Sequence, residues 1–223
     1  MPAGDERLNR ERVLKAAVAL ADQEGIGSVT MRRLAEELGA GAMSLYYHVP
    51  NKDELLSGMV DLVFGEIELP AHAEDWKAAL RRRAISTRDA LRRHPWAVGR
   101  MEATSAPGPN DLRLHDAVLG CLRAAGFSVE MAVQAYSLQD AYIYGFALQE
   151  KNLAFGTREE FAETAAKRVR EVETRAPDVA AAYPNLAEVV AGFVAKHGYS
   201  ADDAFVFGLD VILDGLERFR LAP

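Results

Sequence analysis

The stretch from Thr30 to Lys52, TMRRLAEELGAGAMSLYYHVPNK, constrains the fold of this chain more than any other part of it. It reads as two short helices, Met31–Leu38 and Ala42–His48, joined by a tight turn. Thr30 precedes the first helix, and its hydroxyl can accept a hydrogen bond from a free backbone N–H of the first turn. Gly39 follows that helix and can end it, because glycine adopts positive φ without strain.

The second of these helices has an outer face that is unusual for a surface in water. The helix stops before Pro50, because the residue before a proline disfavours helical backbone. An apolar set can hold the two helices together at an angle: Leu34, Ala35, Leu38, Leu45 and Val49. The side chains left for the outside are Met43, Ser44, Tyr46, Tyr47 and His48. A helix-turn-helix places such a helix in the major groove of DNA, where these side chains meet base edges and phosphates.

The remainder of the chain is predicted to be helical too. It is rich in Ala, Leu, Glu and Arg, with few Pro/Gly clusters. Apolar spacing and capping residues predict an all-α fold, with an N-terminal three-helix head and a larger C-terminal helical body. Besides the pair above, the expected helices are Asn9–Glu24, one from Asn51 to about Phe64, Glu74–Arg93, Pro95–Thr104, Asp111–Ala125, Ser128–Lys151, Glu159–Thr174, Asn185–His197 and Ser200–Leu221. We expect a helix-turn-helix head over residues 1–50, a connecting helix over 51–70 and a larger body over 71–223.

Composition excludes several classes of protein. No segment reaches the ~18 uninterrupted apolar residues of a membrane span, so no membrane partner is expected. The N-terminus, MPAGDERLNRERV, is too charged for the apolar core of a signal peptide. Cys121 is the single cysteine and cannot form an internal disulfide, which fits a reducing cytoplasm. Its apolar neighbours favour a buried structural thiol over a reactive one.

The charge balance sets a condition on any contact with DNA. The formal net charge is −7, which argues against a protein that coats nucleic acid without specificity. Residues 1–55 hold seven basic and nine acidic side chains. DNA binding must therefore rest on a local patch, for which the candidates are Arg10, Arg32, Arg33 and Lys52.

Two of the expected body helices carry more apolar surface than one buried face needs. In the last helix, one stripe consists of Phe205, Leu209, Ile212, Leu216 and Phe219, with Gly208 and Gly215 between. The Ser128–Lys151 helix has a similar stripe that includes Leu138, Tyr142 and Gly145. We expect these two helices and their copies to form a two-fold four-helix interface in a homodimer. The alternative is that both are central helices of a monomer.

The motifs resemble one family closely. The T-x-R-x-L-A-x-x-L-G core, the L-Y-Y-H-V run and the following N-K-x-x-L-L look like the DNA-binding head of the tetracycline-repressor (TetR) family. In the body, R-H-P-W at Arg93–Trp96, A-G-F-S at Ala125–Ser128 and F-V-F-G-L-D-V-I-L-D-G-L-E at Phe205–Glu217 resemble the tetracycline repressor's own subgroup. The resemblance covers nearly the whole chain. It implies an all-helical homodimer that represses transcription at a palindromic operator and is released by a small molecule.

Carried over by position, the family's DNA contacts fall on nine residues: Met31, Arg32, Ala42, Met43, Ser44, Tyr46, Tyr47, His48 and Lys52. Arg32 suits a guanine edge or a phosphate. Tyr46, Tyr47 and Lys52 suit phosphates, whereas Ala42 and Met43 would contact a thymine methyl group. One of the two tyrosines could instead be a plug between helices, and His48 could cap the helix end.

The chain departs from the tetracycline repressor at the drug site. By position, the histidine that holds drug-bound magnesium falls at Met101, and its acidic partner falls at Gln149. Two drug-contacting amides fall near Arg83 and Val118, and another histidine falls near Glu68. A thioether is a poor Mg²⁺ ligand, because that ion prefers hard oxygen donors. We therefore expect an effector other than magnesium-tetracycline, with no bound metal and no cofactor.

The expected effector site is mostly apolar with few polar groups, as small-molecule sites usually are. Its candidate residues are Arg83, Met101, Thr104, Val118, Leu122, Val133, Tyr136, Ser137, Asp140 and Gln149. Asp140 is a carboxylate within an otherwise apolar run, so burial would demand a partner. That partner could be a cationic ligand or Arg83, and a solvent-facing position is the remaining alternative.

An enzyme is not expected. The five histidines are scattered and show no metal-ligand spacing, and the chain has no glycine-rich phosphate loop. The main alternatives are a helical small-molecule-binding protein whose helix-turn-helix is only structural, and a regulator that activates transcription.

Overall fold

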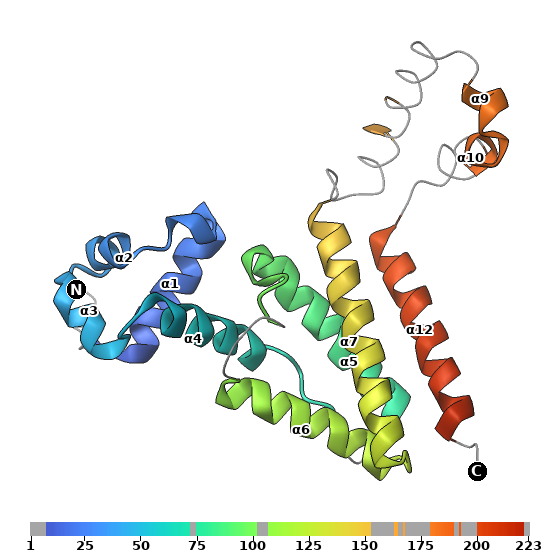
Figure 1. Cartoon of the computed structure of the whole chain (residues 1–223), viewed down its shortest axis with the longest axis horizontal. Coiled ribbons are helices and arrows are strands. Elements are labelled where there is room, and N and C mark those ends of the chain that lie inside the picture. The colour runs from blue at the N-terminus through green and yellow to red at the C-terminus, as the bar shows by residue number, and fades with distance from the viewer. Residues whose placement is uncertain are drawn as a thin grey trace, which may run out of the picture. The chain divides into compact units, whose positions relative to one another are not determined.

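The structure is a computed structural model that describes residues 8–71, 75–101, 107–152, 163–164, 167, 179–189, 192 and 200–220. The described residues form helices and connecting turns, as the sequence predicted, and Figure 1 labels the helices. The chain divides into two compact units. The first comprises Met1–Leu148 with Ile212–Pro223, and the second comprises Gln149–Val211.

The N-terminal head begins with three α-helices: α1 (Arg10–Glu24), α2 (Met31–Leu38) and α3 (Ala42–His48), with a 3₁₀ turn (η1, Ile26–Ser28) after α1. The predicted caps are present, since the Thr30 hydroxyl accepts a hydrogen bond from the backbone N–H of Arg33 at 3.1 Å. Gly39 ends α2 in left-handed backbone at φ 61°. The buried side chains that pack the three helices include Val13, Leu14, Leu20, Leu34, Leu45 and Val49.

Helix α4 (Lys52–Gly65) packs against α1 and α6. Asn51 caps it by accepting from the backbone N–H of Glu54 at 2.8 Å. Helix α6 (Pro109–Ala124) receives its own N-terminal cap from α4, because Asp61 Oδ1 accepts from the backbone nitrogens of Asn110 at 2.9 Å and Asp111 at 3.1 Å. The helix that leads out of the head is thus bonded to the first turn of a body helix.

A second junction joins the head to the body around His94. Its two ring nitrogens lie 2.8 Å from an Asp22 oxygen on α1 and 3.0 Å from a Glu66 oxygen at the end of α4. The Trp96 indole N–H donates to the same Asp22 oxygen at 2.7 Å. Arg93 donates to Glu66 at 2.7 Å. The R-H-P-W motif therefore fixes the end of α5 against the head.

The body of the first unit contains α5 (Trp76–Arg93), α6 and α7 (Val129–Lys151). The expected helix over 95–104 is wrong in extent. A 3₁₀ turn (η2, Pro95–Ala97) is followed by turn residues, because Gly99 adopts φ 80°, outside helical backbone. Residues 102–106, which include Thr104, lie outside the described part.

The C-terminal region includes α9 (Val179–Ala182), α10 (Pro184–Val189) and α12 (Ala201–Arg220). Helix α12 matches the predicted last helix, and Ser200 caps it by accepting from the Asp203 N–H at 3.1 Å. The predicted Glu159–Thr174 helix lies almost entirely outside the described residues, and the Asn185–His197 helix is described only over α10 and residue 192. Among the residues described, no helix is long and apolar enough to cross a membrane.

Candidate nucleic-acid interface and effector site

Helix α3 presents the surface that the sequence predicted. Leu45 is fully buried, which fixes the rotation of the helix on the head core. Met43 is 82% exposed and Tyr47 is 86% exposed, so two large side chains project into solvent. Tyr46 is 44% exposed, so neither tyrosine is a plug between helices. The arrangement suits insertion into a groove, because exposed methionine and tyrosine gain from contact with bases and sugars.

The other predicted DNA contacts surround this face. Ala42, Ser44, Arg32 and Lys52 are exposed, and Met31 and His48 are half-buried. The His48 ring contacts the Tyr47 ring edge to face at 5.2 Å between centroids. All nine residues therefore have exposed or partly exposed side chains on the α2 to α4 segment.

Two of the four basic residues in the predicted patch, Arg32 and Arg33 on α2, are already paired with carboxylates. Arg32 donates to Glu36 at 3.3 Å, and Arg33 donates to Glu24 at 3.0 Å and to Glu37 at 3.1 Å. Hydrogen bonds and Coulombic attraction, first from Glu24, raise the pKa of the exposed Arg33. A DNA phosphate would have to replace these carboxylates. The predicted basic patch is therefore weaker than its residue types suggest.

Inside the body, Arg83 on α5 and Asp140 on α7 form an ion pair. Arg83 is 1% exposed, and its Nη2 atom donates to Asp140 Oδ1 at 2.7 Å. Burial disfavours the Arg83 charge, but the attraction of Asp140 outweighs it and holds the pKa of Arg83 above its usual value. Of the alternatives left open for Asp140, the internal pair with Arg83 is the one observed.

A chain of polar contacts continues from this pair toward α4. The Arg83 guanidinium lies 5.9 Å from the centre of the Tyr136 ring, and the Tyr136 hydroxyl bonds to His115 Nε2 on α6. Burial, then the nearby Asp140 charge, raises the pKa of Tyr136 far above its usual range, so its hydroxyl stays neutral. His115 Nδ1 is 2.9 Å from the Asp111 carbonyl oxygen and 2.7 Å from Asp111 Oδ1, and only the carbonyl contact has hydrogen-bond geometry.

The predicted effector residues do not all share one location. Arg83, Tyr136 and Asp140 are brought together, and Met101, Val118 and Leu122 are buried in the interior. Val133, Ser137 and Gln149 are instead exposed on α7, so these three do not line an interior site within one chain. Their helical positions explain this result, because the buried stripe of α7 consists of Ala132, Ala135, Gln139, Asp140, Ile143 and Ala147.

The predicted dimer stripe is also divided. Phe205, Leu209 and Leu216 are buried, and Tyr142 and Ile212 are half-buried. Only Leu138 and Gly145 of the seven are exposed. Exposed apolar side chains on these two helices that the predicted stripes did not include are Leu148, Phe207 and Val211, and Phe219 of the predicted stripe is exposed as well. The signal was available, since Phe207 and Val211 are one helical turn apart on α12.

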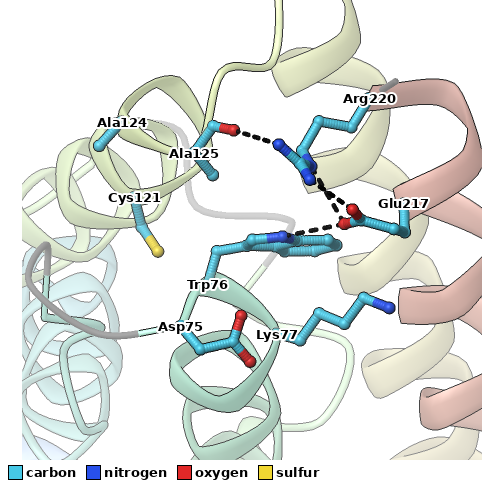
Figure 2. Close-up of a pocket in the computed structure, with 8 residues that line it drawn as sticks. All are labelled: Asp75, Trp76, Lys77, Cys121, Ala124, Ala125, Glu217 and Arg220. Carbon is cyan, nitrogen blue, oxygen red and sulfur yellow. Dashed lines mark hydrogen bonds and ion pairs between the residues drawn. The ribbon is translucent and has the colours of Figure 1, made fainter. Parts of the chain in front are cut away.

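A pocket that the sequence did not predict lies where α5 begins and where α6 and α12 end (Figure 2). Its volume is about 470 Å³, and its lining includes Cys121, Lys77 and Asp75. The Trp76 indole N–H donates to Glu217 at 3.1 Å, and Arg220 donates to the Ala125 carbonyl oxygen at 3.1 Å. These bonds tie the last turn of α12 to the other two helices, and no periodic pattern in the sequence predicts them.

Comparison with known proteins agrees with this geometry. Residues 13–59 match the family model of bacterial regulatory proteins of the tetR family, and residues 69–220 match that of the tetracyclin repressor-like C-terminal domain. The chain therefore belongs to the TetR family of bacterial regulatory proteins.

Individual relatives support the same assignment. The chain is 37% identical over 220 residues to the HTH-type transcriptional repressor DrrR1 of Streptomyces coeruleorubidus, covering 94% of this chain and 77% of that protein. It is 30% identical to the class G tetracycline repressor protein of Vibrio anguillarum, covering 97% of both chains. The solved structure of ActR from Streptomyces coelicolor in complex with actinorhodin is similar with a TM-score of 0.78 and 28% identity, covering 97% of this chain and all of that one (100%).

Proposed function

We propose that this protein is a transcriptional repressor that binds a palindromic operator as a homodimer and is released by a small-molecule inducer. The observation that carries the proposal is the exposed face of α3, in which Met43 and Tyr47 project from a helix anchored by buried Leu45. DrrR1 is a transcriptional repressor, and ActR has been crystallised with actinorhodin, which supports both halves of the proposal.

The roles proposed for the DNA-contacting residues follow from their chemistry. Arg32 would read a guanine edge or hold a phosphate, and Tyr46, Tyr47 and Lys52 would hold phosphates. Ala42 and Met43 would contact thymine methyl groups. Met31, Ser44 and His48 complete the surface. Recognition would then depend on apolar contact and DNA shape more than on bidentate hydrogen bonds.

We propose a functional division into a head over residues 1–50, a connecting helix over 51–70 and an effector-binding and dimerisation body over 71–223. The effector must bind more tightly to the dimer arrangement that releases DNA than to the one that binds it, because only such a difference in affinity shifts the population of the two. The Asp61 cap on α6 supports a route, because movement of α6 would move α4 and its head. The two α3 helices of the dimer would then no longer match DNA half-sites that lie about 34–36 Å apart, or a multiple of that.

The proposed dimer interface uses the exposed side chains of the two long helices. Within the first unit these are Leu138, Gly145 and Leu148 on α7 and Phe219 on α12. Large exposed apolar groups on helices of this length support a partner of the same chemistry. A second copy of the chain satisfies that requirement by two-fold symmetry.

The proposed inducer is not magnesium-tetracycline. Met101 is buried and offers a thioether where a hard donor would be needed, and Gln149 carries no charge to support it. Calorimetric titration with tetracycline and Mg²⁺ tests this directly. Micromolar, Mg²⁺-dependent binding would overturn it.

A DNA-binding assay separates the repressor from a helical small-molecule-binding protein. Fluorescence anisotropy with duplexes from upstream of its own coding region should give specific binding that weakens with salt, with a slope of about −0.9 per phosphate contact. Arg32→Ala combined with Tyr46→Ala should abolish this binding and leave the dimer mass unchanged in analytical ultracentrifugation. A matched control is Lys15→Ala with Glu11→Ala, which removes an exposed pair on α1. DNA binding that does not depend on salt, or an equal loss of DNA binding in the control variant, would favour a helical small-molecule-binding protein.

Transcription from the same promoter with and without the protein separates a repressor from an activator.

A further inference from the structure

A buried guanidinium in the body has donors that the rest of the chain does not use. Arg83 is almost fully buried, and Asp140 engages only its Nη2 atom. Its Nε and Nη1 atoms have no hydrogen-bond partner among the described residues. These two nitrogens carry three of the five guanidinium N–H bonds. Because an unpaired buried donor bears its full desolvation cost, a partner with acceptor atoms would be favoured here.

The charges around Arg83 select the kind of acceptor. Asp140 already neutralises the guanidinium at 2.7 Å. A second carboxyl group, that of Asp111 on α6, lies 2.7 Å from His115 in the same chain of polar contacts. A ligand carboxylate would place one more negative charge in this region. A neutral acceptor oxygen, such as that of a ketone, gains the free N–H bonds without that repulsion.

The residues next to this pair in the sequence are buried as well. Gln139 precedes Asp140 on α7, and its side-chain oxygen also lacks a partner within the described part of the chain. On α5, Leu80 and Ala84 flank Arg83 and are fully buried. The surroundings therefore suit a largely apolar molecule with a few oxygens.

We propose that Arg83 donates hydrogen bonds to a neutral carbonyl oxygen of the effector, which is an apolar, oxygen-bearing small molecule without a negative charge. The proposal rests on the proposed function, in that the body is taken to bind an effector. Asp140 is then a positioning residue, because its ion pair directs the other guanidinium nitrogens toward the ligand.

Three probes on one bicyclic skeleton test the proposal: 1-tetralone, which carries a ketone, tetralin, which has no oxygen, and 1-naphthoate, which is an anion. Their dissociation constants with the full-length protein are measured by NMR titration. We expect 1-tetralone to bind at least about tenfold more tightly than either of the other two, as one to two hydrogen bonds allow. Preference for 1-naphthoate, no preference, or no binding of any probe would overturn the proposal.

Variants identify the residue responsible. Arg83→Met should reduce the ratio of tetralin to tetralone dissociation constants to within about twofold of unity. Arg88→Met is the matched control, because Arg88 is also buried on α5, with its guanidinium 5.1 Å from the Phe146 ring centre. It should leave the ratio unchanged. If Arg83→Met does not fold with Asp140 unpaired, Arg83→Met with Asp140→Leu removes the pair together and should give the same loss of preference.

Operator binding is measured on the same samples. Wild-type protein that binds operator but shows no ketone preference contradicts this inference alone. Protein that binds no operator contradicts the proposed function, whatever the probes show. A ketone preference that survives in Arg83→Met assigns the ligand to other groups and overturns the role of Arg83.

Discussion

Replacing Gly108 by alanine should loosen the junction between α4 and α6. A Cβ atom at residue 108 would lie 2.2 Å from Asp61 Oδ1 and 2.7 Å from Asp61 Cβ, well inside van der Waals contact. The carboxylate cannot move aside freely, because it accepts from the backbone nitrogens of Asn110 and Asp111. The extra methyl group therefore displaces the cap of α6.

The size of the effect follows from the bonds lost. Gly108 has no side chain to cap α6, and Pro109 has no N–H, so Asp61 serves the first free donors of the helix. Loss of a cap costs about 1 kcal/mol. The Asn110 side-chain amide, which donates to Asp61 Oδ2 at 3.1 Å, adds a further ~1 kcal/mol. We expect the free energy of unfolding to fall by about 2 kcal/mol, or roughly 30-fold in the unfolding equilibrium constant.

Urea unfolding followed by far-UV circular dichroism, at one fixed protein concentration, measures this change. Gly27→Ala is the matched control, because a Cβ atom there would meet nothing within 4 Å. Asp61→Asn should fall between the two, since it keeps an acceptor oxygen but loses the charge at the helix N-terminus. A Gly108→Ala protein as stable as Gly27→Ala would refute the argument that Asp61 caps α6.

Two further predictions concern the head junction and the dimer. Burial disfavours ionised Glu66, but hydrogen bonds from Arg93 and His94 outweigh it and lower its pKa. The stabilisation by ionised Glu66 is therefore complete above the ordinary carboxyl pKa, and it is lost as the pH falls through the lowered pKa. Glu66→Gln should lower the melting temperature of the protein at pH 7. On acidification, its melting temperature should fall by less than that of the wild type, as thermal unfolding would show. Leu138→Glu, at a side chain 48% exposed in the single chain, should produce monomers in analytical ultracentrifugation, whereas Leu112→Glu on α6, 57% exposed, should not. A dimer that persists in Leu138→Glu would contradict the interface.

Local chemistry made the head predictable from sequence. Thr30, Gly39 and Asn51 act within three residues of their own helix ends, so their caps could be placed by spacing alone. The division of α3 into buried Leu45 and an exposed face follows from the helical period of about 3.6 residues per turn.

Contacts between distant segments could not be predicted in this way. The His94 ring and the Asp22 carboxylate are 72 residues apart, and Asn110 and its cap Asp61 are 49 apart. Periodicity shows which residues share a face but not which face turns inward. The stripe of Phe205, Leu209 and Leu216 shows this, because its period is the same whether it faces its own chain, where these side chains are buried, or a partner.

A chain with a net negative charge can still bind an operator, because a DNA phosphate can take the place of the carboxylate that pairs with an arginine of the head. Exposed pairs such as Arg32 with Glu36 contribute about 0–1 kcal/mol, so breaking the pair to bind a phosphate costs little. Operator affinity then depends on the simultaneous fit of two α3 helices, each of which adds contact only if the spacing is right. A coupling of about 1–3 kcal/mol between effector and operator would then weaken operator binding about 5- to 150-fold.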